Sequence, residues 1–128
     1  MIVDSSAVVA ILTNEPEGRQ FAGILLAAPI VRISTATYVE LVNVIAKRIG
    51  RSALTDLDDF LEKAEVELEP FTIAQAQWAR HACVTYGKHG KKGLNFGDCF
   101  SYALAKETGE PLLFKGHDFT LTDISPAI

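Results

Sequence analysis

The chain of 128 residues is predicted to fold as one α/β domain, residues 1–128, with a mostly parallel central sheet flanked by helices. Short apolar segments typical of strands alternate with longer segments whose apolar residues repeat at helical spacing. This alternation is typical of two parallel strands joined by a helix. The length suits one hydrophobic core, and no second domain, internal repeat or low-complexity segment is indicated.

Four segments are predicted to be strands. The first is apolar until it reaches Asp4, as expected of a buried strand. The third alternates apolar residues with acids, as expected of a strand that is covered on one face. The four segments are residues 1–4, 30–33, 66–71 and 111–115.

Six segments are predicted to be helices, because capping residues precede apolar residues at helical spacing. Ser5 or Ser6 is expected to cap the first, Thr35 the third and Asn95 the last. The second opens with an acid-Pro-acid sequence, which suits the positive end of a helix dipole. The helices are expected at residues 5–13, from 15 onwards, 36–49, 53–64, 72–86 and 95–108.

Four acidic residues lie where an apolar segment ends or within the first turns of a helix. Asp4 ends the first strand and Asp118 follows the last, so both should reach the carboxyl edge of the sheet, where open α/β sheets place their functional crevice. Glu40 lies in the second turn of one predicted helix, and Asp98 lies in the first turn of another. Taken singly, each also fits a structural role, as a cap, a dipole partner or a solvated group.

Together these four acids indicate a metal site. Carboxylates placed side by side without compensation repel and raise one another's pKa, and a divalent cation removes that penalty. Oxygen ligands with no obligatory His or Cys favour Mg²⁺ or Mn²⁺ over Zn²⁺. Because such an ion can orient a phosphodiester and activate bound water, the chemistry indicated is metal-assisted phosphodiester hydrolysis.

The charge is unevenly distributed along the chain. The formal net charge is −4, yet residues 70–97 contain no acid. Three lysines of this stretch, Lys88, Lys91 and Lys92, fall in a glycine-rich segment that leads to Asp98. This segment either guides a phosphate group towards the acids or is a solvated turn without a partner, and the sequence leaves both open.

The remaining composition favours a cytoplasmic protein with no membrane segment. The longest mostly apolar stretch, residues 21–33, is too short and too interrupted to span a bilayer, and Asp4 lies where a signal peptide would be apolar. Cys83 and Cys99 show no CxxC spacing, so both are expected to be buried free thiols.

Several stretches together resemble the PIN-domain ribonucleases of the VapC toxin type. The resemblance runs from end to end of the chain, and its most distinctive parts are GDCFSYA around Asp98 and the loop at residues 115–119. The stretches are IVDSSA at residues 2–7, YVEL at 38–41, LNFGDCFSYALA at 94–105, LLFKGHDF at 112–119 and TDI at 122–124.

The resemblance implies a function and a set of site residues. It implies an endoribonuclease that uses Mg²⁺ or Mn²⁺, cuts structured RNA such as tRNA or rRNA, and is held inactive by a VapB-type antitoxin. The four acids are then the catalytic quartet, with Asp4, Asp98 and Asp118 as metal ligands. A homodimer is also expected. Two predicted helices have more large apolar residues than a small sheet requires; core packing accounts for most of them, and the remainder could dock an antitoxin helix or a second subunit.

Other polar residues are candidates for auxiliary roles. His117 stands where many relatives have Asn, and it could hydrogen-bond Asp118 or a phosphate. Asp123 is close enough in sequence to assist Asp118 or substitute for it. Hydroxyl groups near helix starts or on helix faces are candidates to orient water or carboxylates; they are those of Ser5, Ser6, Thr35 and Ser101.

Two other classes of protein compete with a nuclease. A Mg²⁺-dependent phosphatase of the same fold class typically needs a second Asp two residues after its nucleophile, and Ser6 occupies that position. A phosphoacceptor domain would need paired acids after the first strand, which are also absent. A non-catalytic module whose acids dock a basic peptide would differ from an enzyme in failing to cleave RNA.

Overall fold

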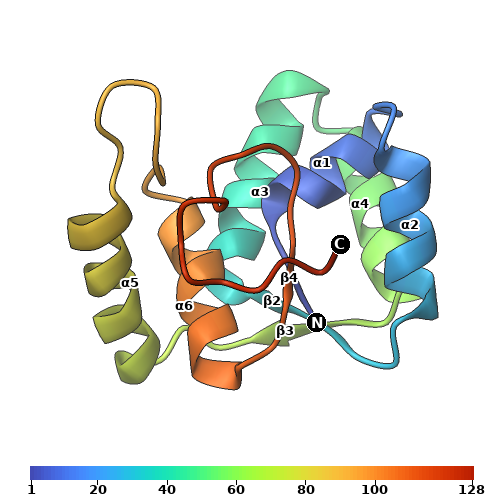
Figure 1. The fold of residues 1–128 in the computed structure, drawn as a ribbon. Helices are drawn as coiled ribbons and strands as arrows, with labels where there is room; N and C mark the ends of the chain where they lie inside the picture. The colour runs from blue at the N-terminus through green and yellow to red at the C-terminus, as the bar shows by residue number, and fades with distance from the viewer.

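The structure is a computed structural model that describes all 128 residues. A four-stranded, wholly parallel sheet in the order β3-β2-β1-β4 lies at the centre, with helices packed around it (Figure 1). This arrangement confirms the predicted α/β class. In chain order the elements are β1 (Ile2–Val3), α1 (Ser5–Leu12), α2 (Gly18–Ala27), β2 (Val31–Ser34), α3 (Thr35–Arg48), α4 (Ala53–Lys63), β3 (Val66–Glu69), α5 (Ile73–Tyr86), α6 (Asp98–Thr108) and β4 (Leu112–Leu113).

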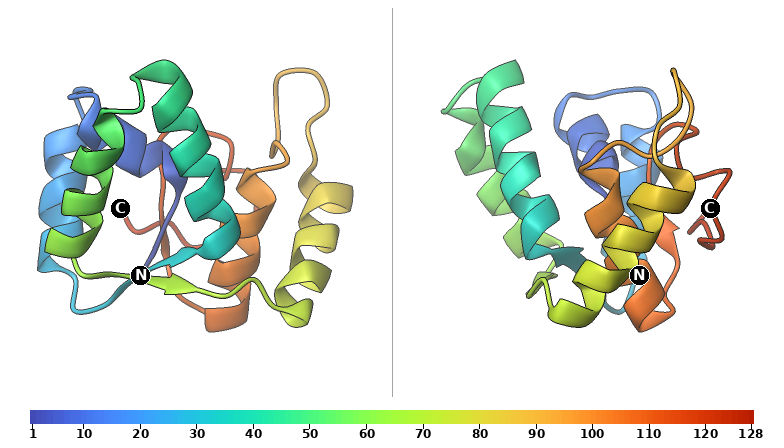
Figure 2. Two further views of the ribbon diagram at one scale, coloured as in Figure 1. Left: turned by 180° about the vertical axis from the view of Figure 1, so that it is seen from behind. Right: turned by 90° about the vertical axis from the view of Figure 1, so that its left-hand side faces the viewer.

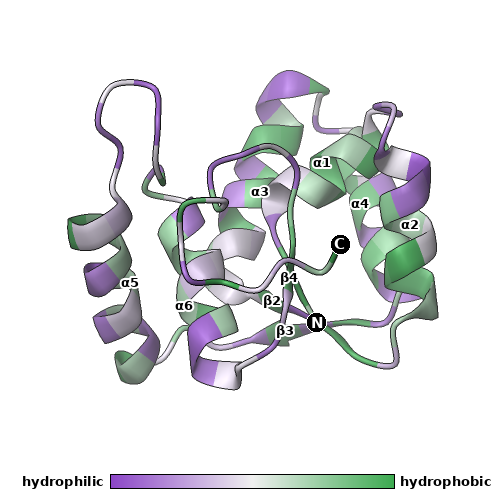
Figure 3. Cartoon of the chain, viewed as in Figure 1, coloured by the Kyte–Doolittle hydropathy of each residue, from purple (hydrophilic) through white to green (hydrophobic).

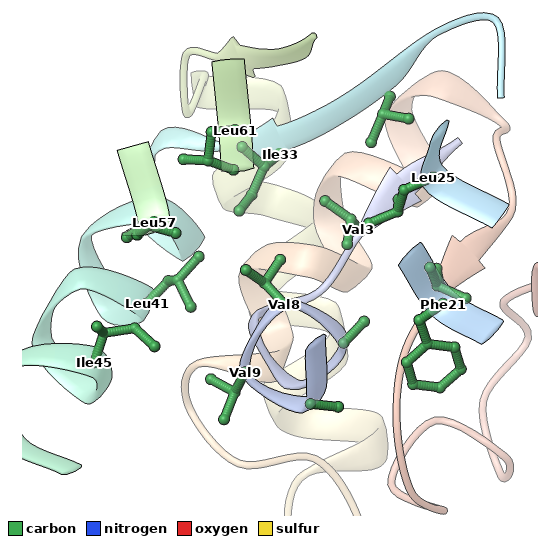
Figure 4. Close-up of a cluster of buried hydrophobic side chains, with 14 of the residues drawn as sticks. Val3, Val8, Val9, Phe21, Leu25, Ile33, Leu41, Ile45, Leu57 and Leu61 are labelled. Carbon is green, nitrogen blue, oxygen red and sulfur yellow. The ribbon is translucent and has the colours of Figure 1, made fainter. Parts of the chain in front are cut away.

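Two hydrophobic clusters cover the two faces of the sheet. Successive strand residues point to opposite faces, and in β1 Val3 joins the larger cluster whereas Ile2 joins the smaller. The larger cluster unites β1 and β2 with α1 to α4, as the labelled side chains of Figure 4 show. The smaller cluster packs against α5 and α6, which lie together on the other side of the sheet (Figure 2).

The starts of α1 and α3 differ from the prediction by one or two residues. The cap of α1 is Asp4, not Ser5 or Ser6, because its carboxylate accepts a hydrogen bond from the Ser6 amide. Similarly, Ser34 caps α3 through the Ala36 amide. The hydroxyl of Thr35, the predicted cap, instead accepts a hydrogen bond from the Phe71 amide.

Other boundaries also differ slightly. The second helix begins at Gly18, after the acid-Pro-acid sequence, and α6 begins at Asp98 with Gly97 at its cap position. The helix expected from residue 72 has Thr72 as its cap, because the Thr72 hydroxyl accepts from the Gln75 amide. The prediction that Cys83 is buried is wrong: it is an exposed free thiol, because α5 packs on the molecule through one face only, whereas Cys99 is buried.

Polar and apolar residues follow this arrangement. Figure 3 shows α1 mostly in the colour of apolar residues, as expected of a helix whose Ala7, Val8, Val9 and Ala10 are all buried. The loop between α5 and α6 is largely polar. No helix is both long and apolar enough to cross a membrane.

Candidate active site

The structure brings all four acids to one hollow of about 390 Å³ at the carboxyl edge of the sheet. Asp4 follows β1 directly, and Asp118 lies in the loop after β4, so the parallel strands deliver both to the same edge. Glu40 reaches the hollow from α3, and Asp98 is the first residue of α6. The predicted convergence of four distant segments is therefore present.

Asp4 is the most firmly held of the four. Its side chain is buried, at 2% exposure, and one carboxylate oxygen accepts from the amide and the hydroxyl of Ser6, at 3.0 and 2.6 Å. The other oxygen accepts from the Ser101 hydroxyl at 2.5 Å. The Ser6 hydroxyl in turn accepts from the Lys115 amide, so β1, α6 and the segment after β4 are joined through this carboxylate.

Asp98 and Asn95 form a reciprocal pair. The Asn95 amide donates to Asp98 Oδ2, and the Asp98 amide donates to Asn95 Oδ1, both at 2.9 Å. This exchange fixes the carboxylate at the start of α6. Burial, followed by repulsion from Asp4, raises the pKa of Asp98 to about 7, although the Asn95 amide opposes the rise. Asp118 and Glu40 add smaller repulsions, which shows that the four charges act on one another.

Glu40 is held between a hydroxyl and a glycine. Ser5 Oγ donates to Glu40 Oε1 at 2.7 Å. On the other side, a Cβ atom at Gly97 would lie 1.4 Å from Glu40 Oε2, so any other residue there would push this carboxylate out of its present position. Burial, and then the charge of Asp4, raise the pKa of Glu40.

No cation of the protein neutralises the four acids. None of them takes part in an ion pair. Lys115 lines the hollow, but its ammonium pairs with Glu15 and, at 3.0 Å, with Glu17. The donor set, carboxylate oxygens with hydroxyl and amide partners, fits a hard divalent cation. No three acids already stand in a ligating arrangement, so an ion would have to draw the side chains closer together.

The basic loop approaches the site at Asp118. Lys91 and Lys92 line one hollow together with His117 and Asp118, and Lys92 lines another with His89 and Asp118. Lys88 is exposed and lines neither. The structure thus places two of the three predicted lysines in hollows that reach Asp118, and His117 lines one of them.

Thr35 and Asp123 neither line the acid hollow nor bond to its acids. Thr35 faces the Phe71 amide. Asp123 accepts hydrogen bonds from the Tyr102 hydroxyl and the Lys106 ammonium, both at 2.8 Å, and the Lys106 bond lowers the pKa of Asp123. By contrast, Ser5, Ser6 and Ser101 bond directly to the acids.

Sequence reasoning missed three charged lining residues and one spacing requirement. Arg48, Glu15 and Lys115 line the hollow, and Gly97 makes room for Glu40. Arg48 could have been found, because Glu40, Val44 and Arg48 are spaced four residues apart and so share one face of a helix. Nothing in the sequence indicates the contact between Gly97 and Glu40.

The parallel sheet with four acids gathered at its carboxyl edge defines an α/β protein with an acidic site. The PIN domain model matches residues 1–124. The chain belongs to the PIN-domain family. This membership confirms the resemblance noted from the sequence.

Individual relatives are similar over nearly their whole length. The chain is 48% identical to Ribonuclease VapC of Mycolicibacterium smegmatis, over 98% of each chain. It is also 48% identical to Ribonuclease VapC30 of Mycobacterium tuberculosis, over 98% of this chain and 96% of the relative.

Among solved structures, VapC20 of M. tuberculosis superposes with a TM-score of 0.77 at 19% identity, over 96% and 95% of the two chains. It is described as a sarcin-ricin loop cleaving toxin. VapBC2 of Rickettsia felis, bound to a promoter DNA fragment, gives 0.71 at 16% identity, over 93% and 89%. These two superpositions confirm the fold.

Proposed function

We propose that this chain is a metal-dependent endoribonuclease that acts as a toxin in the cytoplasm. The single observation that supports this most strongly is the acidic hollow, in which four carboxylates meet and no ion pair compensates any of them. Four unpaired carboxylates in one hollow repel one another and destabilise the folded protein. A divalent cation bound among them would remove this repulsion and could hold a phosphodiester in place.

Asp4, Asp98 and Asp118 would hold Mg²⁺ or Mn²⁺, and Glu40 would complete the site. When bound, the ion supplies charge neutralisation and a water of lowered pKa. The protein supplies the hydrogen-bond partners that hold the acids in position. Ser6 and Ser101 orient Asp4, Asn95 orients Asp98, and Ser5 orients Glu40.

RNA is proposed as the substrate on two grounds. The relatives at 48% identity are named ribonucleases, and the VapC20 neighbour is described as a toxin that cleaves the sarcin-ricin loop. The exposed lysines beside Asp118 suit a phosphate backbone. Structured RNA, either tRNA or rRNA, is therefore the expected substrate class.

The test is incubation of the purified chain with tRNA and with rRNA in Mg²⁺, followed by mapping of new RNA ends. An endoribonuclease produces discrete internal ends in one of the two. A binding module would retain the RNA intact, and a phosphatase-like domain would release phosphate from monoesters without cutting the strand. Either of the last two results would reject the proposal.

A VapB-type antitoxin is the proposed partner, since solved neighbours include toxin–antitoxin complexes from Klebsiella pneumoniae and R. felis. Expressed alone, the chain should slow cell growth, and a small cognate protein should restore it by covering the acid hollow. Unimpaired growth with well-expressed, folded protein would count against the toxin function. A complex that still cut RNA at the full rate would count against occlusion of the site.

A homodimer is also proposed. Val39 on α3 and Phe96 before α6 are exposed large apolar side chains near the site, at 65% and 76%. The Phe96 ring contacts Phe100, which contacts Phe71, each with centroids 5.1 Å apart. Covering such side chains stabilises an interface between copies. A monomeric mass in solution at micromolar concentration would contradict this part of the proposal.

A further inference from the structure

Arg48 lies on the face of α3 that forms a wall of the acid hollow. Glu40, Val44 and Arg48 are four residues apart, so they project from the same side of the helix. All three line the hollow. The helix that presents a catalytic acid therefore also presents a guanidinium, on the residue directly before its C-terminal cap.

This guanidinium has no partner within the protein. Arg48 is exposed, forms no ion pair and donates no side-chain hydrogen bond. The only other cation that lines the hollow, Lys115, is bound to Glu15 and Glu17. Arg48 is thus the one cation of the hollow that is available to a ligand.

Available cations line two neighbouring regions that meet at Asp118. The acid hollow and the two hollows of the basic loop share Asp118 as a lining residue. Lys91 and Lys92 line only the hollows of the basic loop, whereas Arg48 lines only the acid hollow. A polyanion that extends from the acid hollow past Asp118 would therefore meet positive charge in both regions.

We infer that Arg48 is a positioning residue for RNA, binding a phosphate next to the one that is cleaved, on the α3 side of the acids. The inference rests on the proposed ribonuclease function and names how the substrate strand is held. A guanidinium suits this role because its planar fork can donate two parallel hydrogen bonds to one phosphate. Phosphate contacts of this kind fix the position of the strand without reading its sequence.

The distance along α3 favours a neighbouring phosphate over the scissile one. Eight residues of α-helix advance about 12 Å along the axis, so Arg48 starts two turns away from Glu40. A phosphate held at the acids cannot also be the phosphate that Arg48 reaches best. Loss of Arg48 should therefore weaken binding and leave the chemical step unchanged.

A purely structural role for Arg48 gives a different expectation. A cation in the last turn of a helix interacts favourably with the helix dipole. If that were its only role, Arg48→Gln would lower the melting temperature and leave RNA binding unchanged. Under our inference, RNA binding falls as well, whatever the change in melting temperature.

The experiment compares Arg48→Gln with the matched control Arg51→Gln. Arg51 is also exposed and unpaired, lies three residues further on, and does not line the hollow. Arg48→Gln should raise the KM for RNA about tenfold, as expected for loss of one charge-assisted hydrogen-bonded contact, with kcat unchanged. It should also flatten the plot of log affinity against log salt by about 0.7, with binding measured in EDTA. Arg51→Gln should do neither, and Arg48→Lys should fall between wild type and Arg48→Gln.

Single neutral methylphosphonate linkages then locate the contact. The wild type should lose affinity when one particular linkage beside the cleavage position is neutralised. The affinity of Arg48→Gln should not change when that linkage is neutralised, but it should respond to the other linkages as the wild type does. Equal behaviour of Arg48→Gln and Arg51→Gln, or equal sensitivity of both to every linkage, would overturn the inference. Failure of the wild type to cleave RNA would reject the proposed function instead, and the binding comparison in EDTA would still decide the role of Arg48.

Discussion

The Ser101 hydroxyl donates a 2.5 Å hydrogen bond to Asp4, and through it α6 holds the carboxylate that ends β1. Both side chains are buried, at 1% and 2% exposure, and they are 97 residues apart in the sequence. Ser101 also lies 3.3 Å from the Thr37 hydroxyl of α3. One serine therefore links the segments that deliver three of the four acids.

Ser101→Ala should slow RNA cleavage by about 10- to 100-fold, the usual effect of losing an outer partner of a metal ligand. The free energy of unfolding should fall by about 1–3 kcal/mol, because a buried acceptor loses a donor. The measurements are cleavage rate against Mg²⁺ concentration and chemical denaturation. Ser52→Ala, at an exposed serine whose side chain makes no capping hydrogen bond, is the control and should change neither. Equal activity of the two variants would show that the Ser101 bond is incidental.

Gly97→Ala should damage the site although it adds only one methyl group. The new Cβ would overlap Glu40 Oε2, so the carboxylate or the start of α6 must move. Because the overlapping atoms are the end of a flexible side chain, the carboxylate can turn aside, so we expect reduced cleavage with little change in the free energy of unfolding. Gly23→Ala is the matched control: nothing lies within 4 Å of a Cβ there, and the helix should gain up to about 1 kcal/mol. Unimpaired cleavage by Gly97→Ala would contradict the tight fit around Glu40.

The metal-free protein should lose stability as the pH rises through neutrality because of Asp98. Its pKa in the folded protein is about 7, above the ordinary 3.8, so the folded state binds this proton more tightly than the unfolded chain does. The resulting stabilisation is complete below the unfolded pKa, and it disappears as the pH rises through about 7. Asp98→Asn has no such proton.

The free energy of unfolding of wild type and of Asp98→Asn is measured in EDTA from about pH 4 to about pH 8. The difference between the two proteins isolates the contribution of the Asp98 proton. Relative to the variant, the wild type should become less stable towards the alkaline end of this range. Excess Mg²⁺ should reverse the trend for the wild type alone, since an ion that binds only the folded state stabilises it. A difference that did not vary with pH would contradict the electrostatic description of the site.

The lysines of the basic loop should differ in their contribution to RNA binding. Lys91 and Lys92 line hollows that reach Asp118, whereas Lys88 does not. Replacing Lys91 and Lys92 together by Gln should lower the dependence of log affinity on log salt by about 1.4, or about 0.7 for each lost contact with single-stranded RNA. Lys88→Gln should leave the slope unchanged. A salt titration in EDTA makes the comparison, and identical slopes would mean that the loop is a solvated turn.

Much of this fold could be predicted from the sequence because local signals are strong in it. The apolar strand before Asp4, the Thr72 cap and the helical spacing within α3 and α4 depend only on neighbouring residues. The predicted helix caps were wrong by one or two residues where a hydrogen bond to a residue distant in sequence determines which side chain can cap the helix. Thr35 was predicted as a cap, but its hydroxyl is engaged by the Phe71 amide, 36 residues away, and Ser34 caps the helix.

The same division applies to the site. The acids could be proposed because parallel strands bring their carboxyl ends together. Ser5 and Ser101 could be proposed as partners of the acids, but which acid each orients could not be assigned, since the bonds from Ser101 to Asp4 and from Ser5 to Glu40 cross 97 and 35 residues. Asp123 shows the converse: it is close to Asp118 in sequence, yet Tyr102 and Lys106 hold it outside the hollow.

The most direct test of the central claim is the rate of RNA cleavage by metal-free protein as Mg²⁺ or Mn²⁺ is added back, for wild type, Asp4→Asn and Asp98→Asn. We expect no cleavage in EDTA, a saturable rise with metal for the wild type, and rates more than about a hundredfold lower for each variant with the fold retained. Full cleavage in EDTA, or near-wild-type cleavage by either folded variant, would contradict the claim that these acids hold the catalytic ion.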